Sequence, residues 1–266
     1  MKKLIIPLLF VIGLTTFYGC HDNDKSASNA TVGFYLTDAP APFSYKAVNV
    51  DVQGVSYSLD GNGWTNLLIT PRVIDLLRFS NGQDTLLSNI TLEAGVRVQQ
   101  IRLLLGDNNT LTLNDGSVVQ LGTPSGQTSG LKINVTSAVE VTSGYKVVID
   151  FDAARSIVAK GNGTYSLKPV IRAFIEANTS SVSGNLTPSN RITRVFTVTS
   201  AGDTISTVSD TARNNYFMLQ GLFSGTYNIQ AENPANGPLT TLKPNLNVIG
   251  GTIINLGVIA LPELPQ

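Results

Sequence analysis

The chain has almost none of the two residue types that carry most enzyme chemistry. Its 266 residues include one cysteine, Cys20, and one histidine, His21, so neither type occurs from residue 22 onward. This excludes Ser-His-Asp and Cys-His nucleophiles, His-ligated zinc, haem and iron–sulfur clusters from that part. A disulfide within one chain is excluded as well, because it needs two cysteines. The fold must therefore be stabilised by burial.

An excess of positive charge and a phosphate-binding glycine loop are also lacking. The chain has 18 basic and 18 acidic residues, and no basic run follows Lys2-Lys3. We expect no nucleic-acid partner, because such partners require a basic patch. A hydrolase built on two carboxylates needs them about 5 to 10 Å apart, and no spacing here selects such a pair. The sequence therefore predicts a protein that is not an enzyme and has no cofactor, with bound calcium as the one exception left open.

The first twenty residues have the pattern of an export signal. Lys2-Lys3 precede an apolar run from Leu4 to Tyr18, and Gly19 stands directly before Cys20. A positive start and an apolar run of this length are typical of a secretory signal, and the run is shorter than the ~20 residues of a membrane-spanning helix. The Gly-Cys junction resembles the lipobox of bacterial lipoproteins, which implies cleavage before Cys20 and acylation of that residue. The alternative is a plain signal peptide with a spare thiol.

These features predict where the protein resides. We expect a signal peptide over residues 1–19 and a lipid attachment site with a flexible polar tether over 20–30. The membrane is then a partner through lipidated Cys20. The predicted location is the cell envelope, at the outer membrane of a diderm bacterium.

From residue 31 onward the apolar residues recur with a period of two. The alternation of Val48 to Val52 shifts by one residue at Gln53-Gly54 and resumes from Val55 to Leu59. A shift of this kind at a glycine indicates a β-bulge. No segment beyond the signal shows a sustained helical stripe. The sequence predicts an all-β fold with two antiparallel β-sandwich-type domains.

Short motifs in a fixed order run through residues 31–177, which we take as the first domain. They are Leu36-Thr37-Asp38-Ala39-Pro40, Ile74-Asp75-Leu76-Leu77, Leu92-Glu93-Ala94-Gly95, Ile101-Arg102-Leu103, Pro124-Ser125-Gly126, Ser129-Gly130-Leu131-Lys132, Ile149-Asp150-Phe151-Asp152 and Leu167-Lys168-Pro169-Val170. In this order they resemble the lipoprotein family with the domain of unknown function 4382. The resemblance implies a membrane-attached β domain and no catalytic residues.

A stretch of small polar residues, 177–188, indicates a boundary, and residues 182–261 are expected to form a second domain. Its central signature is Phe217-x-Leu219-x-Gly221-Leu222-x-x-Gly225-x-Tyr227, and Gly250-Gly251-Thr252 and Asn255-Leu256-Gly257 follow. These residues resemble the carboxypeptidase regulatory-like, prealbumin-type sandwich. That resemblance implies a carbohydrate-binding-like fold, which serves in binding or as a plain spacer.

Four aspartates are the candidate metal ligands. Asp150 and Asp152 lie on one face at a strand end, and folding could bring Asp38 and Asp75 beside them as an oxygen cage for calcium. The alternative is structural: Asp38 and Asp75 cap turns and strand ends, while the other two pair with basic side chains. The basic residues considered for this pairing are Arg102, Arg155, Lys132 and Lys168.

Two aromatic residues are the candidate ligand-binding side chains. Trp64, the only tryptophan, and Tyr57 flank the turn Gly61-Asn62-Gly63. Their rings could stack on a sugar, or they could simply pack on the sheet.

Taken together, the sequence favours a non-enzymatic binding or adhesion module for a glycan or a surface protein. The alternative is a structural spacer or accessory subunit of an envelope assembly, in which edge strands pair with other proteins.

Overall fold

A computed structural model of the chain describes residues 29–39, 45–123, 129–136, 138, 140, 143–161, 163–233 and 238–263. The expected signal peptide, Cys20 and most of the tether lie outside these residues. The described chain is nearly all β, with helical segments of only three or four residues, which confirms the all-β prediction. In this part of the chain no helix has the length and apolar character needed to cross a membrane.

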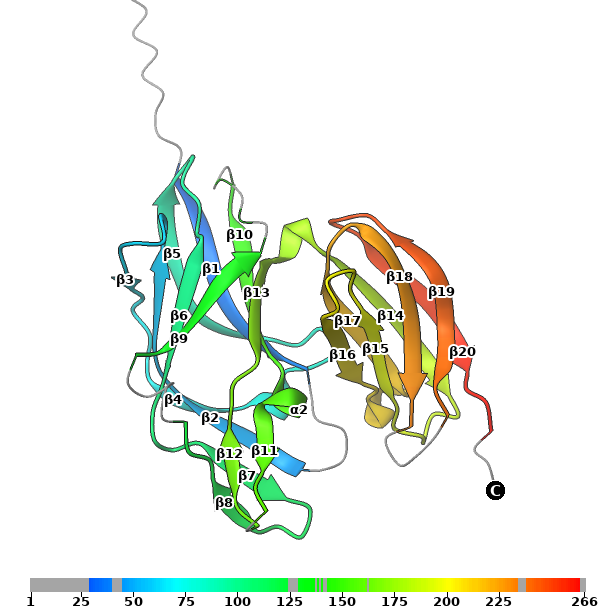
Figure 1. Cartoon of the computed structure of the whole chain (residues 1–266). Helices are drawn as coiled ribbons and strands as arrows, with labels where there is room; N and C mark the ends of the chain where they lie inside the picture. The colour runs from blue at the N-terminus through cyan, green and yellow to red at the C-terminus, as the bar shows by residue number, and fades with distance from the viewer. Residues whose placement is uncertain are drawn as a thin grey trace, which may run out of the picture.

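Eleven strands of the N-terminal part form one sheet (Figure 1). Its path is β5-β1-β10-β13-β9-β6-β2-β7-β8, and β3 and β4 also pair with β2. The strands are β1 (Asn29–Asp38), β2 (Tyr45–Ser58), β3 (Thr65–Asn66), β4 (Arg72–Asp75), β5 (Thr85–Glu93), β6 (Gln100–Leu105), β7 (Thr110–Leu113), β8 (Val118–Gln120), β9 (Leu131–Thr136), β10 (Tyr145–Phe151) and β13 (Ile171–Ile175). A separate ribbon consists of β11 (Ile157–Ala159) and β12 (Tyr165–Leu167).

The sheet curls on itself, so that β5 at one end of its path approaches strands that pair with β2. Ser88 of β5 donates a hydrogen bond to the carbonyl of Leu68 at 2.9 Å, and Arg72 of β4 donates to the carbonyl of Leu86 at 2.7 Å. β5 therefore lies beside the β3–β4 segment. The curled sheet encloses an apolar interior to which most of its strands contribute.

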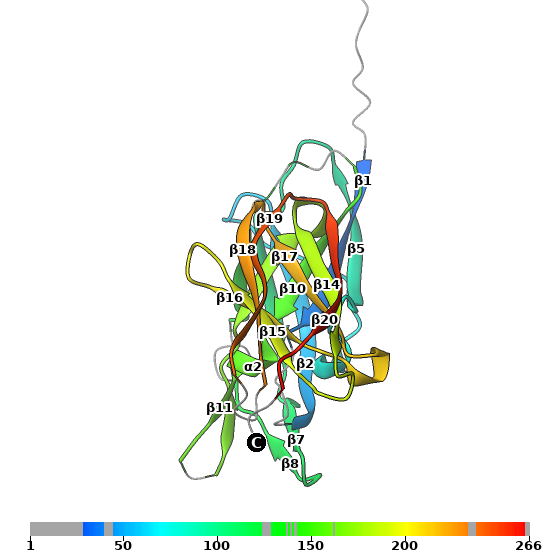
Figure 2. The ribbon, with the colours of Figure 1, turned by 90° about the vertical axis from the view of Figure 1, so that its right-hand side faces the viewer.

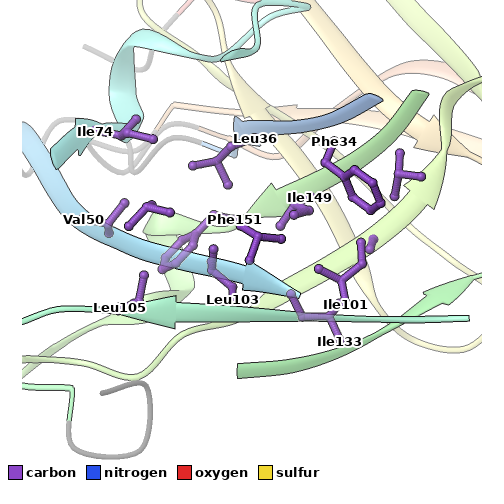
Figure 3. Close-up of a cluster of buried hydrophobic side chains, with 14 of the residues drawn as sticks. Phe34, Leu36, Val50, Ile74, Ile101, Leu103, Leu105, Ile133, Ile149 and Phe151 are labelled. Carbon is purple, nitrogen blue, oxygen red and sulfur yellow. The ribbon is translucent and has the colours of Figure 1, made fainter. Parts of the chain in front are cut away.

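The interior is filled by alternate side chains from facing parts of the sheet (Figure 3). Phe34, Ile101, Leu103, Ile149 and Phe151 have no exposed surface. Because side chains alternate between the two faces of a strand, the residues between them must lie on the outer face.

The bulge predicted in β2 is present. The pairing of β2 with β6 shifts register between Val52 and Gly54, so both Val52 and Val55 point inward although three residues separate them. Buried Asp51 holds this segment, because its carboxylate accepts hydrogen bonds from the backbone and side-chain nitrogens of Asn108 at 3.1 and 3.0 Å. After the bulge Ser56 faces outward.

Two details differ from the sequence expectation. β1 begins at Asn29 rather than after the tether, since Ala30 is buried and pairs with Leu92. The sheets are also mixed: β1 with β10, β9 with β13, and β14 (Ser180–Thr187) with β20 (Ile253–Ala260) are parallel pairs. Alternation of period two is the same in parallel and antiparallel strands, so the sequence pattern does not reveal these pairs.

The C-terminal part has its own apolar cluster between two facing sheets, ordered β17-β14-β20 and β16-β15-β18-β19. Its remaining strands are β15 (Arg194–Val198), β16 (Thr204–Val208), β17 (Tyr216–Leu222), β18 (Gly225–Glu232) and β19 (Thr240–Val248). The polar stretch 177–188, predicted as a boundary, contains β14, which is a central strand of the first of these sheets.

Asn81 connects the two parts. It lies in the turn between η1 (Leu76–Arg78) and β5, has a positive φ of 53°, and is 7% exposed. Its side-chain nitrogen donates to the carbonyl of Val208 at 2.8 Å, and its oxygen accepts from the Thr207 hydroxyl at 2.9 Å and the Met218 amide at 3.0 Å. One amide group thus joins the N-terminal part to β16 and β17.

Arg172 of β13 makes the second connection. Its guanidinium pairs with Asp150 at 2.6 Å and donates to the carbonyls of Gln220 at 2.8 Å and Gly221 at 3.0 Å. A side chain at Gly221 would lie 2.6 Å from the Phe174 ring and 2.9 Å from the guanidinium. This close approach explains why the signature glycine at this position has to lack a side chain.

We predict that Asn81→Gly destabilises the folded chain. Glycine tolerates the positive φ, so the change removes only the side-chain bonds and leaves the Met218 amide without its partner. The expected loss is about 1–3 kcal/mol in the free energy of unfolding, measured by chemical denaturation.

The matched control is Asn214→Gly, at an exposed asparagine with a φ of 56°. It should change the free energy of unfolding by no more than about 0.5 kcal/mol, apart from the backbone-entropy cost that any new glycine brings. Equal losses in the two variants would contradict the role given to Asn81.

Candidate functional site

The parallel pairing of β1 and β10 brings three of the four candidate aspartates to one end of the sheet. Asp38 ends β1, Asp150 lies near the end of β10, and Asp152 directly follows β10. All three are at most 8% exposed. Asp75 lies at the end of β4, and its charge, like those of Asp150 and Asp152, raises the pKa of Asp38.

Each of these carboxylates has a structural partner. Asp38 accepts from the Ala153 amide at 3.0 Å, and Asp152 accepts from the Arg155 amide at 2.9 Å as the N-cap of α2 (Ala153–Ser156). Asp75 accepts from the amides of Val48 at 3.2 Å and Leu77 at 3.3 Å. Asp150 pairs with Arg172. Of the expected basic partners, only Arg155 lies within ion-pair distance, 3.9 Å from Asp152.

Burial makes this acidic group costly to ionise. It raises the pKa of Asp38 well above its ordinary value, although the Ala153 bond opposes this, and the charges of Asp150 and Asp152 raise it further. Burial also raises the pKa of Asp152. One oxygen of Asp38 and one of Asp150 are buried and have no hydrogen-bond partner in the described part of the chain.

Two of the aspartates, Asp150 and Asp152, border a cavity between the two parts of the chain. Its volume is about 460 Å³, and Asp150, Asp152, Arg155, Arg172 and Tyr227 are among its lining residues. Among the described residues, no group of three or more His, Cys, Asp or Glu side chains is arranged to hold a metal ion. Calcium binding by these aspartates stays a prediction, and the cavity contains no nucleophile–base pair of the Ser-His or Cys-His type.

Trp64 lies on the outer face of the curled sheet. The carbon at the centre of the Arg102 guanidinium is 4.0 Å from the centroid of the indole ring, and the Lys132 ammonium is 5.9 Å from it. Trp64 is partly exposed and does not belong to either apolar cluster. The indole is therefore packed against a cation on a polar surface.

Four polar side chains form one register row across this surface. Asn66 of β3 pairs with Ser56 of β2, Ser56 pairs with Arg102 of β6, and Arg102 pairs with Lys132 of β9. Directly paired residues point to the same side of a sheet, so all four lie on the outer face together with Trp64. We call these five residues the Trp64 face.

Tyr57 lies on the opposite side of the same strands. It pairs with Ile101, which is fully buried, and its ring centroid is 6.0 Å from that of Phe34 in the core. The structure therefore does not bring the two candidate aromatic rings together. The bulge in β2 sets this outcome, because it fixes which residues after Gly54 face inward.

The turn before Trp64 is held by Asp60. Its carboxylate accepts from the backbone amides of Asn62 at 2.8 Å and Gly63 at 3.1 Å, and these bonds lower the pKa of Asp60. Gly61 has the positive φ of 83° that the turn requires. These hydrogen bonds fix the turn that leads into Trp64.

Sequence reasoning missed the basic residues of this surface as partners of Trp64. The sequence suggests Arg102 and Lys132 only as partners of Asp150 and Asp152, which lie elsewhere. The alternation within each strand predicts that these two residues face outward. It does not predict the strand register that places them side by side. Arg172 and Asn81 were missed for the same reason, since their partners are far away in the sequence.

We predict that Asp38→Asn stabilises the folded chain at neutral pH. A carboxyl group whose folded pKa is raised costs stability as the pH rises from its unfolded value of 3.8 through the folded value. Asparagine keeps an oxygen for the Ala153 amide and carries no charge. The gain at pH 7 should be about 1.4 kcal/mol for each unit by which the folded pKa exceeds the unfolded one.

Denaturation curves at several pH values test this prediction. The gain over the natural chain should shrink as the pH falls toward 4, while Asp203→Asn, at an exposed turn, should follow the natural chain throughout. A variant less stable than the natural chain at pH 7 would show that the charged form of Asp38 is favoured.

Comparison with known proteins gives one family match. Residues 29–169 match the family described as Domain of unknown function (DUF4382). No match was found among curated proteins.

Several solved structures, pilins among them, are weakly similar to the chain. The Bacillus anthracis TIE protein is 8% identical with a TM-score of 0.25, over 88% of this chain and 35% of that one. The shaft pilin SpaA from Lactobacillus rhamnosus GG is 7% identical with a TM-score of 0.23, over 90% and 99%. BcpA, the major pilin subunit of Bacillus cereus, is 9% identical with a TM-score of 0.19, over 88% and 70%. Scores this low show neither a shared fold nor a shared function.

The match over residues 29–169 covers more than half of the chain, and it shows that the chain belongs to the DUF4382 family.

Proposed function

We propose that this chain is a lipid-anchored, non-enzymatic binding module of the bacterial cell envelope that recognises a glycan on the Trp64 face. The observation that carries the proposal is the placement of the only tryptophan on a polar outer surface, 4.0 Å from a guanidinium, rather than in a core. The absence of His and Cys beyond residue 21 supports a role without catalysis.

The chemistry of this surface suits a sugar. An aromatic ring offers an apolar face on which the C–H side of a pyranose can stack, and its polar neighbours can exchange hydrogen bonds with hydroxyl groups. The Trp64 face supplies an amide in Asn66, a hydroxyl in Ser56 and two cationic donors. Because its strands belong to the curled sheet, these groups are held in place before the ligand arrives, which lowers the entropy cost of binding.

The anchor part of the proposal rests on the sequence alone. Gly19-Cys20 follows an apolar run, and the polar residues up to 28 provide a spacer before β1 begins at Asn29. Acylation of Cys20 would hold the chain at the outer membrane and present its β-sheets to ligands of the envelope.

We predict that glycan binding is lost in Trp64→Ala. The full chain in detergent is screened on a glycan array with and without millimolar calcium, and any hit is repeated with the variant. The control is Tyr216→Ala, which removes another partly exposed ring that carries an arginine, Arg213, at 4.6 Å. The control should bind as the natural chain does.

Two results would contradict glycan recognition at this surface. One is a folded chain, verified by circular dichroism, that binds no glycan on the array. The other is a hit that survives Trp64→Ala but is lost in Tyr216→Ala. Dependence of a hit on calcium would support the predicted aspartate site as well.

We also predict that Cys20→Ser abolishes the lipid anchor. Cells fed a labelled fatty acid should incorporate it into the natural chain and not into the variant, and only the natural chain should partition into the membrane fraction. Because Cys20 is the only cysteine, no other thiol can substitute for it. Label in Cys20→Ser would contradict the proposed attachment site.

A structural spacer is the second candidate function, and one observation favours it. β20 lies at the edge of its sheet on the side of the molecule that Figure 2 shows, and it carries no charged residue. Ile253 and Val258 on this strand are 76% and 72% exposed. Uncharged apolar edges are suited to pairing with another strand. Co-purification of an envelope protein that is lost in Val258→Lys, combined with silence on the glycan array, would favour this function.

A further inference from the structure

We propose that the Trp64 face binds an anionic saccharide, one whose sugar ring carries a carboxylate or sulfate group, and that Arg102 and Lys132 hold this group. The inference rests on the proposed function, since it names the class of glycan that the same surface would take. Three independent features of the described residues support it.

The first feature is a like-charge pair in the sheet. Arg102 and Lys132 are direct cross-strand partners on β6 and β9, so their side chains leave the same face side by side. Like charges at directly opposite positions destabilise a strand pair. A residue choice that conflicts with such a local rule is typical of functional positions.

The second feature is that no acid neutralises this pair. Within the described chain neither Arg102 nor Lys132 forms a salt bridge, although other basic side chains do. Those that are paired with acids are Arg97, Lys146, Arg155, Arg172 and Arg194. The two positive charges beside Trp64 therefore have no acidic partner among the described residues.

The third feature is that Arg102 is held in position. The indole of Trp64 covers one side of its guanidinium, and a side chain at Gly130 would lie 2.7 Å from its stem, so the backbone of Gly130 packs directly against it. Gly130 has a φ of 72°, which also suits glycine. A planar guanidinium fixed over one face of a partly exposed ring can offer its forked donors to a carboxylate or sulfate.

These features define the ligand by its chemistry. The anionic group would lie between Arg102 and the exposed ammonium of Lys132, and the sugar ring that carries it would contact Trp64. A neutral sugar would leave the two cations uncompensated, whereas an anion removes their mutual repulsion on binding. Binding should therefore be tighter at low ionic strength.

The test uses two pairs of matched ligands with the full chain in detergent. The first pair is an oligogalacturonate and its methyl ester, which differ in charge but not in ring structure. The second pair is dextran sulfate and dextran, so the two pairs distinguish a carboxylate from a sulfate. Calorimetry should show that at least one charged ligand binds about tenfold or more tightly than its neutral counterpart, an advantage that falls as salt shortens the screening length from about 10 Å at 0.1 M to 3 Å at 1 M.

Four variants locate the charge. Arg102→Gln should weaken binding of the charged ligand about tenfold or more, because it removes charge-assisted hydrogen bonds. Lys132→Gln should weaken it on the order of threefold, as expected of an exposed ion pair. Lys243→Gln, at an exposed lysine of β19, should leave binding unchanged. Lys132→Glu should abolish binding and raise the melting temperature of the unliganded chain, because it converts the repulsive pair into an attractive one.

The results distinguish this inference from the proposed function on which it rests. A neutral glycan whose binding is lost in Trp64→Ala but is unaffected by Arg102→Gln and Lys132→Gln would overturn this inference and leave the proposed function standing. Equal affinity for charged and neutral partners would do the same. A chain that binds no glycan of either kind would overturn both proposals.

Discussion

The structure depends on one constraint: most strands of the curled sheet must send alternate side chains into a single apolar interior. This constraint places Phe34, Ile101 and Phe151 inside (Figure 3). It leaves Ser56, Arg102 and Lys132 outside. The bulge at Gly54 changes the phase of β2 and so decides that Ser56, not Tyr57, belongs to the outer face. The proposed binding surface is therefore a consequence of how the core is filled.

The same constraint accounts for the connection between the two parts of the chain. Where the strands of the curled sheet end, Asp38 and Asp150 are buried beneath β16 and β17, and Arg172 both neutralises Asp150 and bonds to the carbonyls of β17. Asn81 adds three hydrogen bonds from a single side chain. In this arrangement Asp150, through Arg172, helps to hold the C-terminal part, while the other three aspartates suggested for calcium accept hydrogen bonds from backbone amides of the N-terminal part.

Much of the fold could be predicted from the sequence, and its limits have a physical cause. Alternating apolar residues indicate strands, and the phase shift at Gln53-Gly54 correctly predicted a bulge, because both are local properties of the chain. Strand order and direction are not local, so the parallel pairs and the contact of Trp64 with Arg102 could not be anticipated. Asp38, Asp150 and Asp152 come to one end of the sheet because β1 and β10 pair in parallel, and local alternation does not predict that pairing.

The most direct test of the account is a fluorescence titration. Trp64 is the only tryptophan, so its emission reports on the proposed surface without any label. If a glycan binds on the Trp64 face, the emission should change in a saturable way, with a midpoint equal to the dissociation constant found by calorimetry. A glycan that binds by calorimetry and leaves the emission of Trp64 unchanged would contradict the account.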